Sequence, residues 1–374
     1  MMERSIKIYV AALMICCLFS LSGCEKFLEE KTSKKLAVPT TLADFQALLD
    51  QSGTMSISSP GSGEISADDY YLTDAKWACL TAEGQRRMYT WEKDNLYSNS
   101  PDNDWTYVYK AVYTCNTVLS GLKDLPRTSF NATEWDNVKG QALFCRGNNF
   151  LDAAIVWCLA YDKNTAGADL GLPLKMSIDF NETYTRSNVQ QTYERIIMDL
   201  KAAVPLLPVV PLSNHRPSKA GAYGMISRAY MAMMEYHQAE LYADSCLALN
   251  HTIMDYNTLT VTANYPITKV NNTEGIYFRY LQAVTIIYNA TPITPKELYD
   301  AYLPGDLRKA AYFRMNADGT YYFKGSYAGS SGPFSGIATD EMYFNKAECL
   351  ARKGNVSESM DLLNTLLIKR WDKT

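Results

Sequence analysis

Apolar residues recur at three- and four-residue steps through two long stretches of this chain, and that spacing restricts both stretches to α-helices. Such steps return side chains to the same face of a helix, where they can be buried together. The first stretch runs from Asn103 to Leu122, with capping candidates at Asp102 to Asp104, and it ends before Pro126. The second runs from about Trp135 to Ala160. We expect the two to form an antiparallel helical hairpin.

Two further stretches share a second pattern, in which large, small and aromatic residues alternate in a helical hairpin. The first spans Ser218 to Asn250, and a copy follows about 120 residues later, from Tyr343 to Leu366. This spacing resembles a tetratricopeptide repeat of about 34 residues. One match is a weak signal, because any amphipathic hairpin mimics it, but two matches beside the first hairpin predict a repeat scaffold. We therefore expect a mainly α fold of tetratricopeptide-like helical hairpin repeats, with long irregular loop inserts and little β structure.

Two shorter patterns mark where other helices begin. Thr41 to Asp44 is expected to open a short helix with Phe45 and Leu49 on one face. Ser187 and Gln190 have the spacing of a capping box, which places another helix start there.

Two segments lack a helical pattern. Residues 51–74 are rich in Ser, Gly and Asp and predict an irregular loop. A longer mixed segment, Thr252 to Thr339, separates the two repeats and contains the β-type runs Gly275 to Tyr280 and Thr285 to Tyr288. Long irregular inserts on a rigid helical frame often carry function.

The first residues have the pattern of a cleaved leader. Arg4 and Lys7 precede an apolar run from Ile8 to Leu21, which is too short to cross a bilayer comfortably, since a span needs ~20 residues. The run Leu21-Ser22-Gly23-Cys24 resembles the lipobox of bacterial lipoproteins, in which the leader is cut before a cysteine that becomes lipidated. An ordinary secretory signal and a short anchor helix are the alternatives.

Composition excludes two classes of function. The formal net charge is −4 and no basic patch stands out, so we expect no nucleic-acid partner. No segment after the leader has 18 uninterrupted apolar residues, so no transmembrane helix is expected there.

The usual catalytic and metal-binding motifs are missing from the sequence. It has no G-x-S-x-G, H-E-x-x-H, G-x-x-x-x-G-K or C-x-x-C motif, and its three histidines, His215, His237 and His251, are scattered. We therefore expect no catalytic residue, no metal site and no cofactor, although a pair of carboxylates cannot be judged without distances. Six cysteines follow Cys24, mostly in helix-like apolar patterns, and buried thiols are expected in preference to disulfides.

Aromatic residues are abundant, with 27 Tyr and 6 Trp, and they suggest a sugar-binding surface. Such rings stack on the apolar face of a sugar while nearby polar groups bond its hydroxyls. The best candidate stretch is loop-like and precedes the first long helix. For Tyr89, as for the neighbouring Trp91, covering the helical core is an equally good interpretation. The candidate ligand-binding residues are Tyr70, Tyr71, Trp77, Arg86 and Tyr89, with Tyr280, Tyr288 and Tyr327 as weaker candidates.

Several segments occur in an order typical of one protein family. Each is a weak match alone, but their common order covers nearly the whole chain. The chain resembles the RagB/SusD family, the starch-utilisation lipoproteins of Bacteroidota. The matching segments are Cys24 to Glu30, Thr41 to Leu49, Trp105 to Tyr109, Asn116 to Leu119, Gly140 to Arg146, Gly171 to Leu174, Tyr193 to Leu207 and Glu341 to Lys353.

The resemblance implies a lipoprotein of the cell outer membrane, acylated at Cys24 with lipid such as palmitate and facing the outside. Such proteins lie as a lid on a SusC-like TonB-dependent transporter and deliver oligosaccharides to it, or peptides in some branches. Family members are not enzymes. In the family, ligand contacts often come from the region before the first long helix, although no motif fixes which residues make them.

The expected organisation is a signal peptide at 1–23, a tether at 24–40 and a single SusD-like domain at 41–374. The domain would have an N-terminal part up to about residue 215 and a C-terminal part, 216–374, that holds the repeats and the insert. The family usually continues beyond the late repeat, so a C-terminal truncation or a short variant is expected.

Two other functions stay open. A tetratricopeptide-like scaffold that binds only a protein partner is the main alternative, and a glycoside hydrolase is a weaker one. The ligand class is also open, because starch, host glycan, plant glycan and peptide all fit an aromatic surface.

Overall fold

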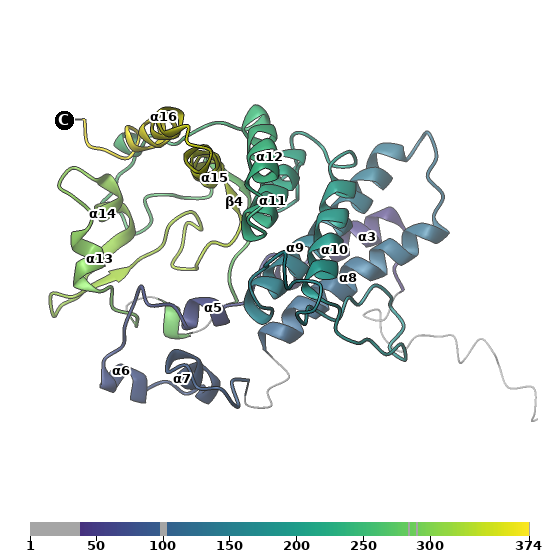
Figure 1. The fold of residues 1–374 in the computed structure, drawn as a ribbon, viewed down its shortest axis with the longest axis horizontal. Helices are drawn as coiled ribbons and strands as arrows, with labels where there is room; N and C mark the ends of the chain where they lie inside the picture. Colours follow the sequence, from purple (N-terminus) through teal and green to yellow (C-terminus); the bar gives the residue numbers. More distant parts are fainter. Residues whose placement is uncertain (1–37, 98–102, 283–284, 289–290, 374) are drawn as a thin grey trace, which may run out of the picture. The chain divides into compact units, whose positions relative to one another are not determined.

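Three long helices form the largest helical layer. The computed structural model describes residues 38–97, 103–282, 285–288 and 291–373, and Thr41–Thr374 forms one compact unit. Helix α9 packs between α8 and α10 (Figure 1), and most of its residues from Gly140 onward are buried. The hairpin predicted for the first two long helices is confirmed. The three helices are α8 (Asp104–Asp124), α9 (Ala132–Trp157) and α10 (Val189–Ala203).

A short N-terminal helix covers this layer. Helix α3 (Leu42–Leu49) begins at a capping box, in which the Thr41 hydroxyl accepts the Asp44 N–H at 3.1 Å and the Asp44 carboxylate accepts the Thr41 N–H at 3.0 Å. Phe45 is buried against α8, where Gly121 leaves no room for a side chain of its own. The predicted short helix and its buried face are thus confirmed.

The capping box of α10 lies one residue later than the sequence indicated. The Asn188 amide oxygen accepts the Gln191 N–H at 2.7 Å, and the Gln191 side chain accepts the Asn188 N–H at 3.2 Å. Ser187 is not the cap, because its hydroxyl donates to the Leu172 carbonyl at 2.8 Å. That contact ties the start of α10 to the preceding loop.

The two predicted repeats stack on each other. Helices α11 (Lys219–Ala232) and α12 (Tyr236–Leu249) form the first, and α15 (Thr339–Arg352) and α16 (Val356–Leu367) form the second. Helix α12 packs against α15, so the hairpins are neighbours in space despite the long insert between them. The prediction of a mainly α fold with tetratricopeptide-like repeats is confirmed.

Each repeat has a serine hydroxyl that donates to a carbonyl of the neighbouring helix, from the first helix in one repeat and from the second helix in the other. The Ser227 hydroxyl of α11 donates to the Ala239 carbonyl of α12 at 2.9 Å. In the second repeat the Ser359 hydroxyl of α16 donates to the Ala347 carbonyl of α15 at 2.7 Å. A small hydroxyl lets the two helices approach closely while both polar groups stay satisfied.

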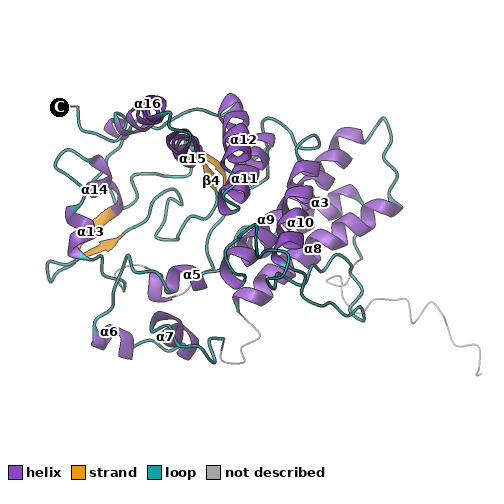
Figure 2. Ribbon diagram, viewed as in Figure 1, coloured by secondary structure: helices purple, strands orange, loops and turns teal. Residues whose placement is uncertain are grey.

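The insert holds the strands described in this chain, and they are few (Figure 2). Two antiparallel pairs form: β1 (Gly275–Tyr277) with β4 (Ile337–Ala338), and β2 (Phe313–Met315) with β3 (Tyr321–Phe323). The β1–β4 pair holds the end of the insert against a segment in its first third, since Gly275 lies opposite Ala338. The other elements of the insert are η2 (Tyr256–Thr258), η3 (Thr285–Ile287), α13 (Lys296–Asp300) and α14 (Leu307–Tyr312).

One β-type run is not a strand. Residues Thr285–Ile287 form the 3₁₀ helix η3, and the consecutive Ile286 and Ile287 are both buried. A strand on a one-sided sheet would bury alternate residues only, so burial of two neighbours favours a tight turn. The run is apolar because it fills a core.

That core joins the insert to the region before α8. Residues 51–74, predicted as irregular loop, contain the short helices α4 (Ser52–Met55) and α5 (Ser62–Ile65), and α6 (Asp74–Ala78) and α7 (Glu83–Tyr89) follow. A small apolar cluster, separate from the main core, holds them together. Its buried members are Ile65, Tyr70, Leu72, Leu80, Met88, Ile286 and Ile287.

All six cysteines of the described region are free thiols. Cys115, Cys145, Cys246 and Cys349 are buried, while Cys79 is exposed. Burial raises the pKa of the Cys145 thiol to about 11, so it stays protonated at neutral pH. Within the described residues, none of the helices has the length and apolar character needed to cross a membrane.

Candidate functional site: an aromatic surface

Two of the predicted binding residues expose their rings to solvent. Tyr71 is 41% exposed and Trp77 is 36% exposed, which is high for such large side chains. Trp77 lies on α6, whose first turn is fixed by the Thr73 hydroxyl accepting the Lys76 N–H at 3.3 Å. Both rings are therefore available for stacking.

Arg86 clamps Trp77 in place. Its guanidinium lies 5.4 Å from the centroid of the Trp77 ring and donates to the carbonyls of Ala78, at 3.1 Å, and Leu80. These contacts tie α7 to the end of α6. One face of Trp77 is thus covered by a cation, and the guanidinium is engaged by contacts within the chain.

Tyr70 and Tyr89 support the surface from below. Tyr70 is only 9% exposed, and its hydroxyl donates to the Ile65 carbonyl at 2.7 Å. The Tyr89 hydroxyl accepts the Leu72 N–H at 2.9 Å, and the two rings lie 5.8 Å apart. Burial raises the pKa of the Tyr70 phenol. The structure places Tyr70 in the small buried cluster, and the half-buried Tyr89 packs against that cluster.

Two further rings belong to this surface, and the sequence did not single them out. Tyr299 on α13 and Tyr321 on β3 stack with ring centroids 3.5 Å apart and planes 13° apart. The Lys309 ammonium lies 4.3 Å from the Tyr299 centroid. Burial and the neighbouring Tyr321 hydroxyl raise the pKa of Tyr299 to about 12, so this phenol remains a hydrogen-bond donor at neutral pH. In the sequence, only the aromatic run Tyr321-Tyr322-Phe323 could have pointed to this pair of rings.

Main-chain hydrogen bonds connect the two groups of rings. Tyr71 and Ile293 exchange two bonds, of 2.8 and 2.9 Å, and the Thr294 N–H donates to the Tyr321 carbonyl at 2.7 Å. Neighbouring strands are ~4.8 Å apart, so the backbones of Tyr71 and Tyr321 are roughly 10 Å apart. Two segments distant in sequence therefore meet here.

A charge contact at the adjacent turn supports the same arrangement. Two hydrogen bonds from Thr320 lower the pKa of the Asp318 carboxyl, and the Lys76 ammonium of α6 lowers it further. The β2–β3 turn thus lies beside α6. We call Tyr71, Trp77, Tyr299 and Tyr321 the aromatic surface.

The remaining candidates lie elsewhere. Tyr288 packs against the small cluster, and Tyr280 is half-buried beside His215, with ring centroids 6.0 Å apart. Trp91 is 76% exposed, so it does not cover the helical core. Its φ of 57° is rare for a bulky residue.

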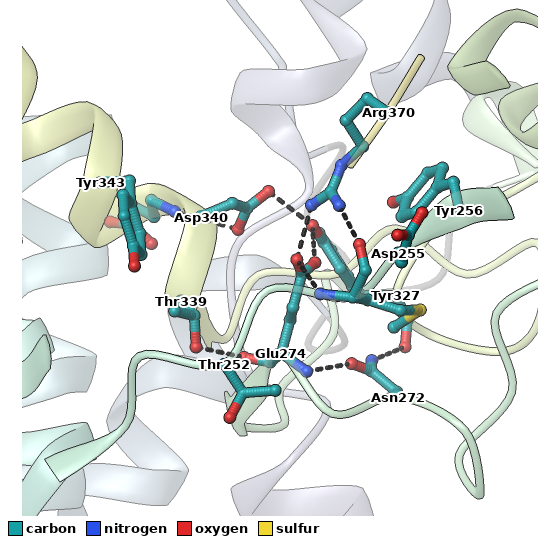
Figure 3. A network of polar contacts seen from close by, with 12 residues as sticks. Thr252, Asp255, Tyr256, Asn272, Glu274, Tyr327, Thr339, Asp340, Tyr343 and Arg370 are labelled. Carbon is teal, nitrogen blue, oxygen red and sulfur yellow. Dashed lines mark hydrogen bonds and ion pairs between the residues drawn. The ribbon is translucent and has the colours of Figure 1, made fainter. Parts of the chain in front are cut away.

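Tyr327 lies in a buried polar network, which Figure 3 shows from close by. Its hydroxyl is 2.7 Å from a Glu274 oxygen and 2.5 Å from an Asp340 oxygen, and Arg370 donates to Glu274 at 2.6 Å. Glu274 is fully buried and Tyr327 nearly so. The network joins the insert to both ends of the second repeat. The Tyr327 hydroxyl bonds within this network and does not face a ligand.

Two other predictions concern the lipidated cysteine and metal binding. Cys24, the lipidation candidate, lies outside the described residues together with the leader. In the described part of the chain, no group of three or more His, Cys, Asp or Glu side chains could hold a metal ion.

Comparison with known families gives one match by sequence. Residues 26–231, just over half of the chain, match the family SusD-like, whose description is starch-binding and associating with the outer membrane. No curated protein matches the chain.

Solved structures match over most of the chain. A SusD superfamily protein from Bacteroides thetaiotaomicron VPI-5482 is 22% identical with a TM-score of 0.72, covering 89% of this chain and 81% of that one. A SusD superfamily protein from Bacteroides fragilis is 16% identical with a TM-score of 0.70, covering 90% and 82%. A SusD-like carbohydrate binding protein from Bacteroides vulgatus ATCC 8482 is 18% identical with a TM-score of 0.66, covering 90% and 76%. At these identities the matches establish the fold.

Proposed function

Since this chain belongs to the SusD-like family of starch-binding proteins that associate with the outer membrane, we propose that it is a lipid-anchored, surface-exposed protein that binds oligosaccharides and delivers them to a partner transporter. The binding site we propose is the aromatic surface. The transporter would be SusC-like and TonB-dependent. The protein itself would not be an enzyme.

The exposed and fixed position of Trp77 carries this proposal. A ring that stacks on a sugar must present one face to solvent and stay in place, because ordering it on binding would cost affinity. Arg86 holds Trp77 at 5.4 Å and is itself held by two carbonyls. Two main-chain bonds to Ile293 fix the backbone of Tyr71. The Trp77 ring is thus preorganised, and the Tyr71 ring projects from a fixed backbone.

The surface also offers polar groups beside its rings. The Tyr299 and Tyr321 hydroxyls and the Lys309 ammonium lie within one stacked group. Sugars need this combination, since their ring carbons present an apolar face and their hydroxyls need hydrogen-bond partners. Starch, host glycan, plant glycan and peptide remain the candidate ligands.

Glycan titration of Trp77→Ala tests the site. The probes are maltoheptaose, a xylan oligosaccharide and a pectin oligosaccharide, followed by calorimetry or affinity electrophoresis. For the probe that binds, Trp77→Ala should weaken binding by ~10-fold, the loss of about one stacking contact. The matched control is Phe130→Ala, which removes a fully exposed ring from the turn before α9. Equal affinity in wild type and Trp77→Ala would remove Trp77 from the site.

Membrane attachment needs its own experiment. We expect Cys24→Ser to abolish incorporation of labelled palmitate and to release the protein from the outer-membrane fraction. Retention of Cys24→Ser in the membrane with its leader attached would favour a short anchor helix instead.

Partner capture separates the proposal from its alternatives. We expect the tagged protein to co-purify with an outer-membrane transporter and to bind a glycan. Co-purification without binding to any glycan or peptide on an array would favour a scaffold that binds only protein. Release of shorter oligosaccharides by the purified protein would show a hydrolase.

A further inference from the structure

A cavity of about 650 Å³ lies in the α8–α9 hairpin, apart from the residues of the aromatic surface. The last turns of α8, the first turns of α9 and the loop residues Met176 to Ile178 enclose it. Its volume is in the range of sites for small organic ligands. Nothing in the proposed function uses it.

Every charged side chain that lines the cavity is cationic, although the chain as a whole has a net charge of −4. Cations gathered in a concave site raise the local concentration of anions, because low-dielectric walls focus the field. The four are Lys123, Arg127, Lys139 and Arg146.

The two arginines are already neutralised. Arg146 is buried and donates two hydrogen bonds to Asp199, of 2.7 and 2.8 Å. Arg127 donates two bonds of 2.8 Å to Asp136. These forks fix the floor and the rim of the cavity, and they leave little charge for a ligand.

The two lysines are different. Across the described residues, neither Lys123 nor Lys139 has an ion pair with a carboxylate. The carboxylate that interacts electrostatically with Lys139 is Asp136. The Arg127 hydrogen bond lowers the pKa of this carboxyl most, and the Lys139 charge lowers it further. Both Asp136 oxygens accept from Arg127. The lysines therefore leave positive charge unneutralised at the mouth of the cavity.

An aromatic wall stands beside one of these lysines. The Trp135 indole N–H donates to the Leu125 carbonyl at 2.8 Å, which fixes the plane of the ring. The Lys139 ammonium lies 4.9 Å from the Trp135 centroid. The ammonium thus covers one face of the ring, and a ligand that lies against the edge of Trp135 brings its carboxylate close to Lys139.

The floor of the cavity is rigid and satisfied. The Asn116 amide donates to the Lys175 carbonyl at 2.9 Å and accepts from Arg146 at 2.9 Å. The site is preformed, which lowers the cost of binding. The apolar part of the lining comes from Leu119, Leu143 and Met176.

We propose that this cavity binds a small organic anion, with a ring-shaped body against Trp135 and a carboxylate that accepts hydrogen bonds from Lys139. Lys123 adds a second positive charge at the rim. Two sources have this chemistry, the acidic sugar of a glycan and an aromatic carboxylic acid. The proposal does not depend on sugar binding at the aromatic surface.

Calorimetric titration with three probes tests the proposal. The probes are digalacturonate, its neutral counterpart digalactose, and phenylacetate, each at low ionic strength where charge attraction is least screened. The variants are Lys139→Gln and, as matched control, Lys110→Gln, an exposed lysine of α8 outside the cavity. Fluorine NMR of protein labelled with 5-fluorotryptophan locates the ligand, with the Trp135 signal assigned from Trp135→Leu.

We expect an acidic probe to bind and to shift the Trp135 signal, and Lys139→Gln to weaken that binding by roughly 10-fold to 100-fold. Lys110→Gln should bind as wild type does. Binding of digalacturonate assigns an acidic sugar, and binding of phenylacetate alone assigns an aromatic acid. The proposal is overturned if neither acid binds, if digalactose binds equally well, if Lys139→Gln has no effect, or if binding leaves the Trp135 signal unshifted.

Discussion

The buried network around Tyr327 predicts an unusual dependence of stability on pH. One hydroxyl proton serves two carboxylates, with oxygens 2.7 Å away on Glu274 and 2.5 Å away on Asp340 (Figure 3). Arg370 and the Met254 N–H both donate to Glu274, at 2.6 and 2.8 Å, whereas no cation of this network donates to Asp340. The charge of Glu274 therefore disfavours a second charge on Asp340.

The magnitude follows from the pKa of Asp340. Burial, and then the charge of Glu274, raise the pKa of this carboxyl to about 6. An unfolded aspartate has a pKa of ~3.9, so the difference is about 2 pH units, or at most ~3 kcal/mol of unfolding free energy. Since the side chain is partly exposed, we expect ~1–3 kcal/mol. The folded chain holds the proton more tightly, so the penalty is absent below about pH 4, grows as pH rises, and is complete above about pH 6.

Asp340→Asn removes this penalty. An amide stays neutral and can still donate to the Tyr327 oxygen. In urea unfolding followed by circular dichroism, Asp340→Asn minus wild type should be near zero at about pH 4 and reach about +1–3 kcal/mol at about pH 7. The control is Asp361→Asn, the same change at an exposed site of α16, which should give a flat difference.

Two results would refute the reasoning. A flat difference between wild type and Asp340→Asn would mean that the fold does not raise the pKa of Asp340. A variant that becomes less stable than wild type as pH rises would mean that the ionised carboxylate stabilises the fold. Glu274→Gln should behave in the opposite way, because it leaves the buried Arg370 without its partner, and it should destabilise by ~3 kcal/mol at neutral pH.

Three further predictions use the same urea unfolding measurement. Arg146→Met should cost ~3 kcal/mol, because it leaves the buried Asp199 with only its 3.1 Å contact to Arg195, and a neutral result would show that this contact suffices. Ser227→Ala and Ser359→Ala should each cost ~1 kcal/mol, since each removes a hydrogen bond between the two helices of a repeat, and a neutral result would show that this bond does not stabilise the repeat. Gly171→Ala should cost ~2 kcal/mol, because a Cβ there collides with the Asn188 main chain, whereas Gly319→Ala has open space around it and tests only its φ of 85°.

Long periodic patterns predicted the frame well. Helix α8 begins next to the expected cap, where the Asn103 side chain accepts the Thr106 N–H at 3.0 Å. In a pattern about twenty residues long, one residue that departs from the spacing does not obscure the helix. The start of α10 was harder, because Ser187 and Asn188 both have a glutamine three residues later. Only the contact of Ser187 with Leu172 decides between them, and that contact is not local in sequence.

The aromatic surface was only partly predictable. Tyr70 and Tyr71 are neighbours in a loop without periodicity, so no pattern says that the first is buried and the second exposed. Tyr299 and Tyr321 come to the site through Ile293 and Thr294, which pair with the two distant segments. Sequence reasoning recognised a stretch of suitable residues. It could not recognise a partner segment more than 200 residues away.

The stacking of α12 on α15 explains how such a surface can exist on a loop. Closing a long insert is entropically costly, but the cost rises only slowly with length, and here the contact between α12 and α15 holds both ends together. Residues of the segment 294–321 that lie outside the buried clusters are then free to vary without unfolding the frame. The main core lies in the helices, whereas the rings lie at 71–77 and 299–321. Exchanging the segment 294–321 should therefore change ligand preference while leaving the helical frame folded.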